Sequence, residues 1–266
     1  MGDIINMDIT NYISECIINR VPISFSKYGD GEYNCMVINQ TGGANCDNDT
    51  YTLELKKNLI ESLKYIVEET DNGYIGMWKT KNITDYYKTL VNKEIKYAKY
   101  HTIINNIWEE SQEETTSKVN LYKTIKYSPL KKIIICNNLL IKSKILLNLD
   151  DMIIVSYNNW FNKNNVDKIL EYFKKYENDQ CIVITCCGMG AKVIISKLHK
   201  LYPYNIYLDF GSALDQLCTK INTRAVINNY NLFYMTYKEL IPDNWDDEEY
   251  DHIEQLANKN LGLHLK

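Results

Sequence analysis

The sequence contains little arginine and no long apolar run. Only Arg20 and Arg224 are arginine among its 30 basic residues, which are scattered along a chain with a formal net charge of -4. Proteins that bind nucleic acid usually gather basic residues into a patch or stripe, so we expect no nucleic-acid partner. No stretch approaches the ~20 apolar residues that a membrane-spanning helix needs, so we expect no transmembrane segment.

Paired cysteine motifs are also missing. None of the eight cysteines forms a Cys-x-x-Cys pair, and Cys186 and Cys187 are adjacent in a predicted strand, where their side chains would point to opposite faces. A zinc or redox motif is therefore not expected. The N-terminus shows no basic segment followed by an apolar one, which is the pattern of a signal peptide. We expect a cytoplasmic protein in a reducing compartment.

From about residue 130 onward, short apolar runs alternate with helical periodicity. Near-continuous apolar runs are typical of strands that are buried on both faces. Between them, residues 166–176 and 191–201 carry apolar side chains at helical spacing. This alternation predicts an α/β fold, Rossmann-like, with a mostly parallel sheet flanked by helices. The predicted strands are 133–136, 152–157, 181–187 and 206–208.

The first half of the chain is less regular. A helix is predicted over residues 52–67, with Asp49 or Thr50 as its N-cap. Residues 84–127 have no Gly or Pro and predict a helical insertion packed on the sheet. No linker rich in Pro, Gly or Ser is present, so residues 1–266 are predicted to form a single domain. The strands expected in this half are 23–27 and 74–78.

The first segment that suggests chemistry is Gly29-Asp30-Gly31-Glu32, directly after the predicted strand 23–27. Glycines on both sides of an acid permit a sharp turn that aims a carboxylate outward. Two carboxylates two residues apart suit Mg²⁺ or Mn²⁺ that also binds phosphate oxygens. The alternative is a solvated turn, since Asp-Gly is also a common hairpin signal.

The second segment runs from a strand into a helix through Gly188 and Gly190. Free backbone amides at such a junction favour an anion, so a nucleotide phosphate fits here, with Lys192 close by. A tight turn with glycines for packing is the plainer interpretation. Because Asp209 follows about 20 residues later, a dinucleotide fingerprint is a further alternative, although Val193 replaces its third glycine. That alternative implies a Rossmann methyltransferase or oxidoreductase.

The third segment, residues 208–215, ends the next predicted strand. Asp209 lies at the edge where open α/β sheets bind ligands, so it is a candidate general base or sugar-binding group. Asp215 is a second catalytic candidate, although Ser212-x-x-Asp215 also matches a helix capping box. The fork of Arg224 suits a diphosphate, and a structural ion pair explains it equally well.

These three segments, in this order, resemble the GT-D fold glycosyltransferases, a family first described as a domain of unknown function in bacterial adhesin glycosylation. The resemblance loosely spans residues 20–225. Two positions depart from it: Met189 stands where bacterial members tend to have Pro, and Ser212 where they tend to have His. The role of that histidine cannot be transferred to this chain. The residues that carry the resemblance are 27–33, 187–193 and 208–212.

The resemblance implies a metal-dependent glycosyltransferase that moves a sugar from a nucleoside-diphosphate donor, with UDP expected, to a hydroxyl of a glycan or glycoprotein. By position, Asp30 and Glu32 would hold Mn²⁺ or Mg²⁺ and the diphosphate. A non-catalytic glycan-binding module is the alternative outside enzyme classes. The residues expected to contact the donor are Tyr28, Gly29, Gly188, Gly190, Lys192, Ser212 and Arg224.

Overall fold

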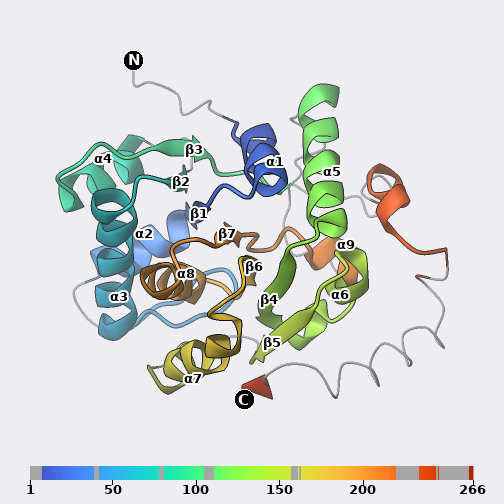
Figure 1. Cartoon of the computed structure of the whole chain (residues 1–266). Helices are drawn as coiled ribbons and strands as arrows, with labels where there is room; N and C mark the ends of the chain where they lie inside the picture. The colour runs from blue at the N-terminus through green and yellow to red at the C-terminus, as the bar shows by residue number, and fades with distance from the viewer. Residues whose placement is uncertain are drawn as a thin grey trace.

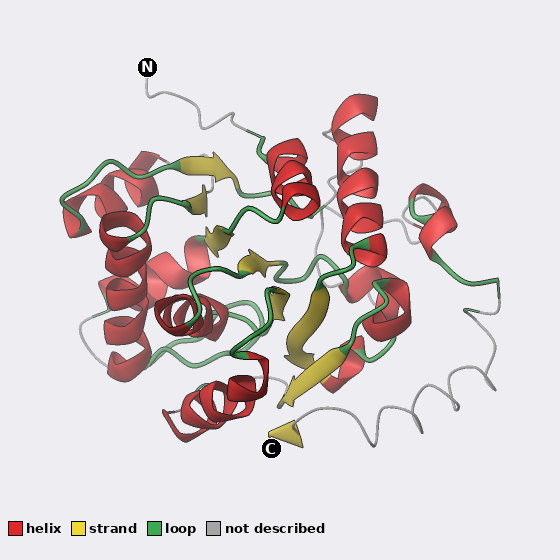
Figure 2. Cartoon of the chain, viewed as in Figure 1, coloured by secondary structure: helices red, strands yellow, loops and turns green. Residues whose placement is uncertain are grey.

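A single parallel sheet organises the chain in the computed structural model (Figures 1 and 2). Its strand order is β3-β2-β1-β7-β6-β4-β5-β8, and every neighbouring pair is parallel. The predicted α/β fold is therefore confirmed, and the described sheet is entirely parallel. The structure describes residues 8–38, 42–77, 81–104, 111–156, 161, 163–219, 234–243, 245 and 264–265. The strands are β1 (Ile23–Tyr28), β2 (Gly73–Met77), β3 (Tyr97–Lys99), β4 (Lys131–Asn137), β5 (Asp151–Val155), β6 (Cys181–Cys186), β7 (Ile206–Asp209) and β8 (His264–Leu265).

Helices cover both faces of this sheet. Figure 1 shows α1, α5, α6 and α9 over one face and α2, α3, α7 and α8 over the other. Each face of the sheet packs in its own hydrophobic core. Alternate side chains of strand β4 enter these two cores: Ile134 packs in the first, and Ile133 and Ile135 pack in the second. This is why the central strands appear as continuous apolar runs. The helices are α1 (Thr10–Asn19), α2 (Asp30–Val37), α3 (Leu53–Lys64), α4 (Lys81–Leu90), α5 (Gln112–Tyr127), α6 (Ser143–Leu146), α7 (Lys163–Phe173), α8 (Gly190–Leu201) and α9 (Asp215–Thr219).

The first half of the chain differs in two places from its predicted pattern. The helix expected over 52–67 is α3, but its N-cap is Thr52, whose hydroxyl accepts from the Leu55 amide at 3.0 Å, and not Asp49 or Thr50. The segment 84–127 is helical in α4 and α5, yet β3 lies between them and extends the sheet. Among the described residues, no helix is long and apolar enough to cross a membrane.

A buried carboxylate anchors the amino end of β5. Asp151 is almost completely buried and accepts hydrogen bonds from the hydroxyls of Tyr172 at 3.0 Å and Tyr176 at 2.5 Å, while Lys175 pairs with it at 2.6 Å. Burial alone would raise the pKa of Asp151, but the hydrogen bonds from Lys175 and the tyrosines outweigh it and hold the pKa below its usual value. The ionised form is therefore the stabilising one.

We expect Asp151→Asn to lower the free energy of unfolding by about 1–3 kcal/mol at pH 7, because buried donors lose a charged acceptor. A depressed pKa in the folded state gives stability that is present above the unfolded pKa of about 3.9 and is lost as the pH falls through the folded value. Urea unfolding at several pH values measures this. Asp167→Asn, on the exposed side of α7, is the control. A difference from wild type that stayed constant down to pH 2 would contradict the interpretation.

Candidate functional site

A cavity of about 390 Å³ opens at the carboxyl edge of the sheet. The chain leaves β7 toward the face covered by α9, whereas it leaves β1 and β6 toward the opposite face, covered by α2 and α8. Loops that diverge in this way create a crevice, and α/β sheets commonly bind ligands there. The location favours a binding site for a small molecule.

The Gly29–Glu32 segment is the start of a helix. Helix α2 begins at Asp30, and the Gly29 amide donates to Glu32 Oε2 at 2.8 Å. Neither Gly29 nor Gly31 has a positive φ, so neither is needed for a left-handed turn. Instead, a Cβ at Gly31 would lie 3.3 Å from Asn45 Cβ, so its small size permits close packing of another segment. The hairpin-turn alternative is therefore wrong.

The two carboxylates of this segment have different surroundings. Asp30 is exposed, lines the cavity and makes no hydrogen bond or ion pair with any described residue. Glu32 is only 6% exposed, with Oε1 at 2.8 Å from Lys192 Nζ and Oε2 on the Gly29 amide. Asp30 thus presents an unshared carboxylate to the cavity, whereas both Glu32 oxygens already have partners.

A buried ion network forms the base of the cavity. The Lys192 ammonium lies 2.8 Å from Glu32 Oε1 and 3.0 Å from Asp209 Oδ2. Asp209 also accepts the Lys27 amide at 3.0 Å and the Gly211 amide at 3.1 Å. Burial alone would lower the pKa of Lys192, but the carboxylates of Asp209 and Glu32 raise it well above its usual value. Lys192 is therefore a permanent cation that ties α2, α8 and β7 together.

The two catalytic candidates of the third segment lie in different places. Asp209 is 0% exposed and does not line the cavity, and both of its oxygens accept hydrogen bonds. This geometry favours a positioning role over contact with a substrate. Asp215 is half-buried and lines the cavity with Ser212. Helix α9 begins at Asp215, whose amide donates to the Ser212 carbonyl at 3.2 Å.

Lys27 begins the segment 27–33 that carries the resemblance, but the sequence patterns assigned it no role in the site. It is buried at the end of β1, its ammonium donates to the Phe210 carbonyl at 2.9 Å, and it lies 5.2 Å from the centroid of the Tyr100 ring. Burial lowers its pKa. A Cβ at Gly211, where φ is +54°, would lie 2.4 Å from Lys27 Nζ, so glycine is needed there for both backbone and space.

The glycine turn between β6 and α8 faces a carboxylate of the protein itself. Gly188 has φ +63°, and a Cβ there would lie 2.3 Å from Asp49 Oδ2. The turn expected to bind phosphate therefore has Asp49 directly against it. Gly190 is the first residue of α8 and lines a second cavity, of about 220 Å³, instead of the first.

The remaining donor candidates lie behind the cavity wall or outside the described residues. Tyr28 and Gly29 are buried and do not line the cavity. Tyr28 packs edge-to-face against Tyr87 at 5.7 Å, and the Tyr87 hydroxyl donates to the Gly29 carbonyl at 3.2 Å. Tyr28 and Gly29 therefore support the β1–α2 junction from within the core and do not contact the cavity. Arg224 lies outside the described residues.

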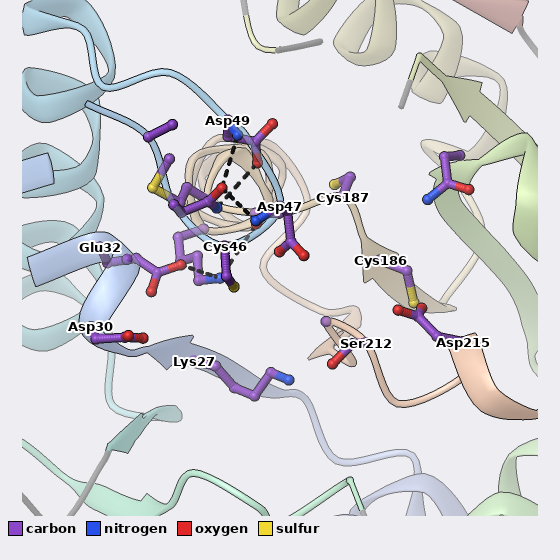
Figure 3. Close-up of a pocket in the computed structure, with 18 of the residues that line it drawn as sticks. Lys27, Asp30, Glu32, Cys46, Asp47, Asp49, Cys186, Cys187, Ser212 and Asp215 are labelled. Carbon is purple, nitrogen blue, oxygen red and sulfur yellow. Dashed lines mark hydrogen bonds and ion pairs between the residues drawn. The ribbon is translucent and has the colours of Figure 1, made fainter. Parts of the chain in front are cut away.

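A further wall of the cavity comes from residues 44–51, which carry no recognisable motif. An isolated bridge joins Ala44 to Thr50, and the amides of Asp47 and Asp49 both donate to Asn45 Oδ1, at 3.0 and 2.8 Å. The sequence signal for a loop of defined conformation was the pair Gly42-Gly43. Both residues have positive φ in the structure. Figure 3 shows this segment above the cavity, with Asp30 and Glu32 on one side and Ser212 and Asp215 on the other.

The charge of the described lining is strongly acidic. Its two lysines are already engaged, Lys192 by two carboxylates and Lys27 by the Phe210 carbonyl. Such a lining attracts cations and repels anions. No group of three His, Cys, Asp or Glu side chains in the described parts of the chain is arranged to hold a metal ion. The five carboxylates in the lining are Asp30, Glu32, Asp47, Asp49 and Asp215.

The fold of this chain is shared with solved structures of other proteins. No protein-family model and no curated protein matches the chain. A solved DUF1792 glycosyltransferase from Streptococcus sanguinis aligns over 98% of this chain and 100% of its own, at 14% identity and a TM-score of 0.63. The chain has the DUF1792 fold. A structure described as a distinct glycosyltransferase fold of domain of unknown function 1792 aligns over 91% and 96%, at 15% identity and a TM-score of 0.54. The structural resemblance expected from the three segments is thus confirmed.

Within this DUF1792 fold, Lys192→Met should lower the free energy of unfolding by about 3–5 kcal/mol, because Glu32 and Asp209 would stay buried without their shared cation. Urea unfolding measures the loss. Lys197→Met, at a half-exposed position of the same helix, should change stability by about 0.5 kcal/mol or less.

The double variant Lys192→Met with Glu32→Gln should be more stable than Lys192→Met alone, since one of the two uncompensated charges is removed. Equal losses for Lys192→Met and Lys197→Met would show that the buried ion pairs contribute nothing to the fold.

Proposed function

We propose that this protein is a metal-dependent glycosyltransferase that transfers a sugar from a nucleoside-diphosphate donor, with UDP as the expected nucleotide, to a hydroxyl of a glycan or glycoprotein. Three observations support the proposal. The chain shares its fold with DUF1792 glycosyltransferases over nearly its whole length. Its cavity lies at the ligand-binding edge of the sheet. The observation that carries the metal dependence is the carboxylate of Asp30, which lines an acidic cavity and is unpaired among the described residues.

The charge balance of the cavity is the physical reason for a metal. A nucleoside diphosphate is an anion, and the described lining carries five carboxylates but only two lysines. Of these lysines, Lys192 is shared by Glu32 and Asp209, and Lys27 is hydrogen-bonded to the Phe210 carbonyl. The excess of negative charge would repel the diphosphate. Asp30 and Glu32 would hold a divalent cation, whose positive charge would offset this repulsion. When bound, it would also neutralise the charge that develops on the leaving diphosphate.

The residues present fit such an ion. Mg²⁺ and Mn²⁺ prefer oxygen ligands, and Mg²⁺ is usually held by one or two carboxylates together with substrate phosphates and water. Asp30 supplies one available carboxylate, and Glu32 supplies a second whose Oε1 is shared with Lys192. A site that the protein completes only with donor phosphates agrees with the lack of a three-residue cluster among the described side chains.

The other residues then divide into positioning and contact roles. Asp209 and Lys192 fix the β1 end, the α8 start and Glu32 relative to one another. Ser212 and Asp215 stand across the cavity from Asp30, where they can hydrogen-bond the ribose or the sugar of a bound donor.

A Rossmann methyltransferase or oxidoreductase is the alternative that the glycine turn left open. The geometry of that turn argues against it, since the Asp49 carboxylate lies against Gly188. A cofactor pyrophosphate that approached this turn without a metal would meet that negative charge directly.

Asp30→Asn should reduce Mn²⁺-dependent release of UDP from UDP-hexoses by about 100-fold or more, because a metal ligand supplies several kcal/mol of charge stabilisation. Its melting temperature should stay close to that of wild type, since Asp30 is exposed and pairs with none of the residues that the structure describes. The assay follows UDP release from a panel of UDP-hexoses with and without Mn²⁺. Asp71→Asn, exposed at the opposite edge of the sheet just before β2, should behave as wild type.

Binding measurements separate the functional alternatives. Calorimetry should show UDP binding by wild type with Mn²⁺, weak binding without it, and weak binding to Asp30→Asn in both conditions. Full metal-dependent turnover by Asp30→Asn would contradict the metal assignment. Thermal stabilisation by S-adenosylmethionine or NAD, and none by UDP with Mn²⁺, would reject the glycosyltransferase proposal. Sugar binding without metal dependence or donor hydrolysis would identify a glycan-binding module.

A further inference from the structure

A second cavity adjoins the first. Its volume is about 220 Å³, and it lies between the N-terminal ends of α3 and α8. Asp49 and Met189 line both cavities. A molecule in the smaller cavity would therefore lie against two side chains that also border the larger one.

The smaller cavity has the chemistry of a site for an uncharged sugar. Its lining combines the hydroxyls of Thr50 and Thr52 with the apolar side chains of Leu55 and Phe161. Sugars present hydroxyls along their edges and C–H groups on their faces, so they bind where a few polar groups surround an aromatic or aliphatic surface. Asp49 is the one charged side chain in this described lining, and it also belongs to the lining of the first cavity.

Asp49 is held in place by Asn45 on one side and by the space beside Gly188 on the other. Its amide donates to Asn45 Oδ1 at 2.8 Å, the Asn45 amide donates to its carbonyl at 3.1 Å, and Asn45 Nδ2 lies 3.4 Å from its Oδ2. On the other side, the absence of a side chain at Gly188 leaves the space that its carboxylate fills. The side chain is 9% exposed. It is a pre-positioned carboxylate that borders two binding spaces.

We propose that the smaller cavity is the acceptor subsite and that Asp49 is the catalytic base, an inference that rests on the proposed glycosyltransferase function. The Asp49 carboxylate takes the proton of an acceptor sugar hydroxyl, and that hydroxyl oxygen forms a bond to the anomeric carbon of the donor sugar. The bond between this carbon and the diphosphate oxygen breaks, and its electron pair leaves with the nucleoside diphosphate.

The other carboxylates of the site fit this role less well. Asp209 is enclosed, with both oxygens accepting hydrogen bonds from backbone amides. Asp47 and Asp215 line the larger cavity but not the smaller one, so neither borders the space of an acceptor. Asp30 is the ligand offered to the metal. Asp49 is the described carboxylate that touches both spaces.

The test uses Asp49→Asn in the full chain, with p-nitrophenyl β-D-glucoside and p-nitrophenyl β-D-galactoside as acceptor probes and water as the acceptor common to all assays. Transfer and donor hydrolysis should both fall about 10²–10⁴-fold, the usual loss when a general base is removed. The affinity for UDP with Mn²⁺ should stay within about twofold of wild type. Glu54→Gln is the matched control, because Glu54 is exposed, follows the same segment and lines neither cavity.

Two further variants keep the proposal falsifiable if Asp49→Asn is unstable. Sodium formate should partly restore turnover to Asp49→Ala, since it can supply the missing carboxylate. Phe161→Leu should raise the KM for the glycoside and leave the donor KM unchanged. Undiminished transfer by Asp49→Asn would overturn the base assignment, and loss of UDP–Mn²⁺ binding would make Asp49 a metal ligand instead. Failure of wild type to hydrolyse any UDP-hexose would refute the proposed function itself, an outcome visible before any variant is compared.

Discussion

Lys192 carries the one interaction on which the architecture of the site depends. Its ammonium is buried between Glu32 at the start of α2 and Asp209 at the tip of β7, at 2.8 and 3.0 Å. Either carboxylate alone in that interior would be costly, and a shared cation with further hydrogen bonds is what makes both tolerable. Three segments that are far apart in the sequence therefore meet at fixed distances, and Asp209 extends the constraint to the amides of Lys27 and Gly211.

This network also decides what the cavity can bind. The Lys192 ammonium is paired with two carboxylates and therefore attracts an incoming phosphate only weakly. The Lys27 ammonium is hydrogen-bonded to the Phe210 carbonyl. The lysines therefore give the lining less positive character than their number suggests. What remains toward the ligand is acidic, so the stability of the protein core and the proposed need for a divalent cation have the same physical origin.

Sequence patterns predicted the central sheet well and the loops poorly, for a physical reason. Strands β4, β5, β6 and β7 are buried on both faces, so their sequences are near-continuous apolar runs, which predict strands directly. Strand β3 has three residues, Tyr97, Ala98 and Lys99, at the edge of the described sheet, and so leaves no such signal. Asp49 gave no sequence signal either, because its position at the cavity depends on the space left by Gly188, which is far along the chain, as well as on local hydrogen bonds with Asn45.

The acid-x-acid motif shows the same limit at the scale of two residues. Glu32 lies two residues after Asp30, which suggests a chelating pair, but it also lies three residues after the N-cap Gly29, from where its carboxylate reaches back to the Gly29 amide. Asp30 and Glu32 are consequently unequal: one carboxylate is open to the cavity and the other is built into the fold. With so few protein oxygens free, an ion bound there would take much of its coordination from donor phosphates and water. Metal and donor affinity would then be linked, since each supplies what the other lacks in an acidic cavity.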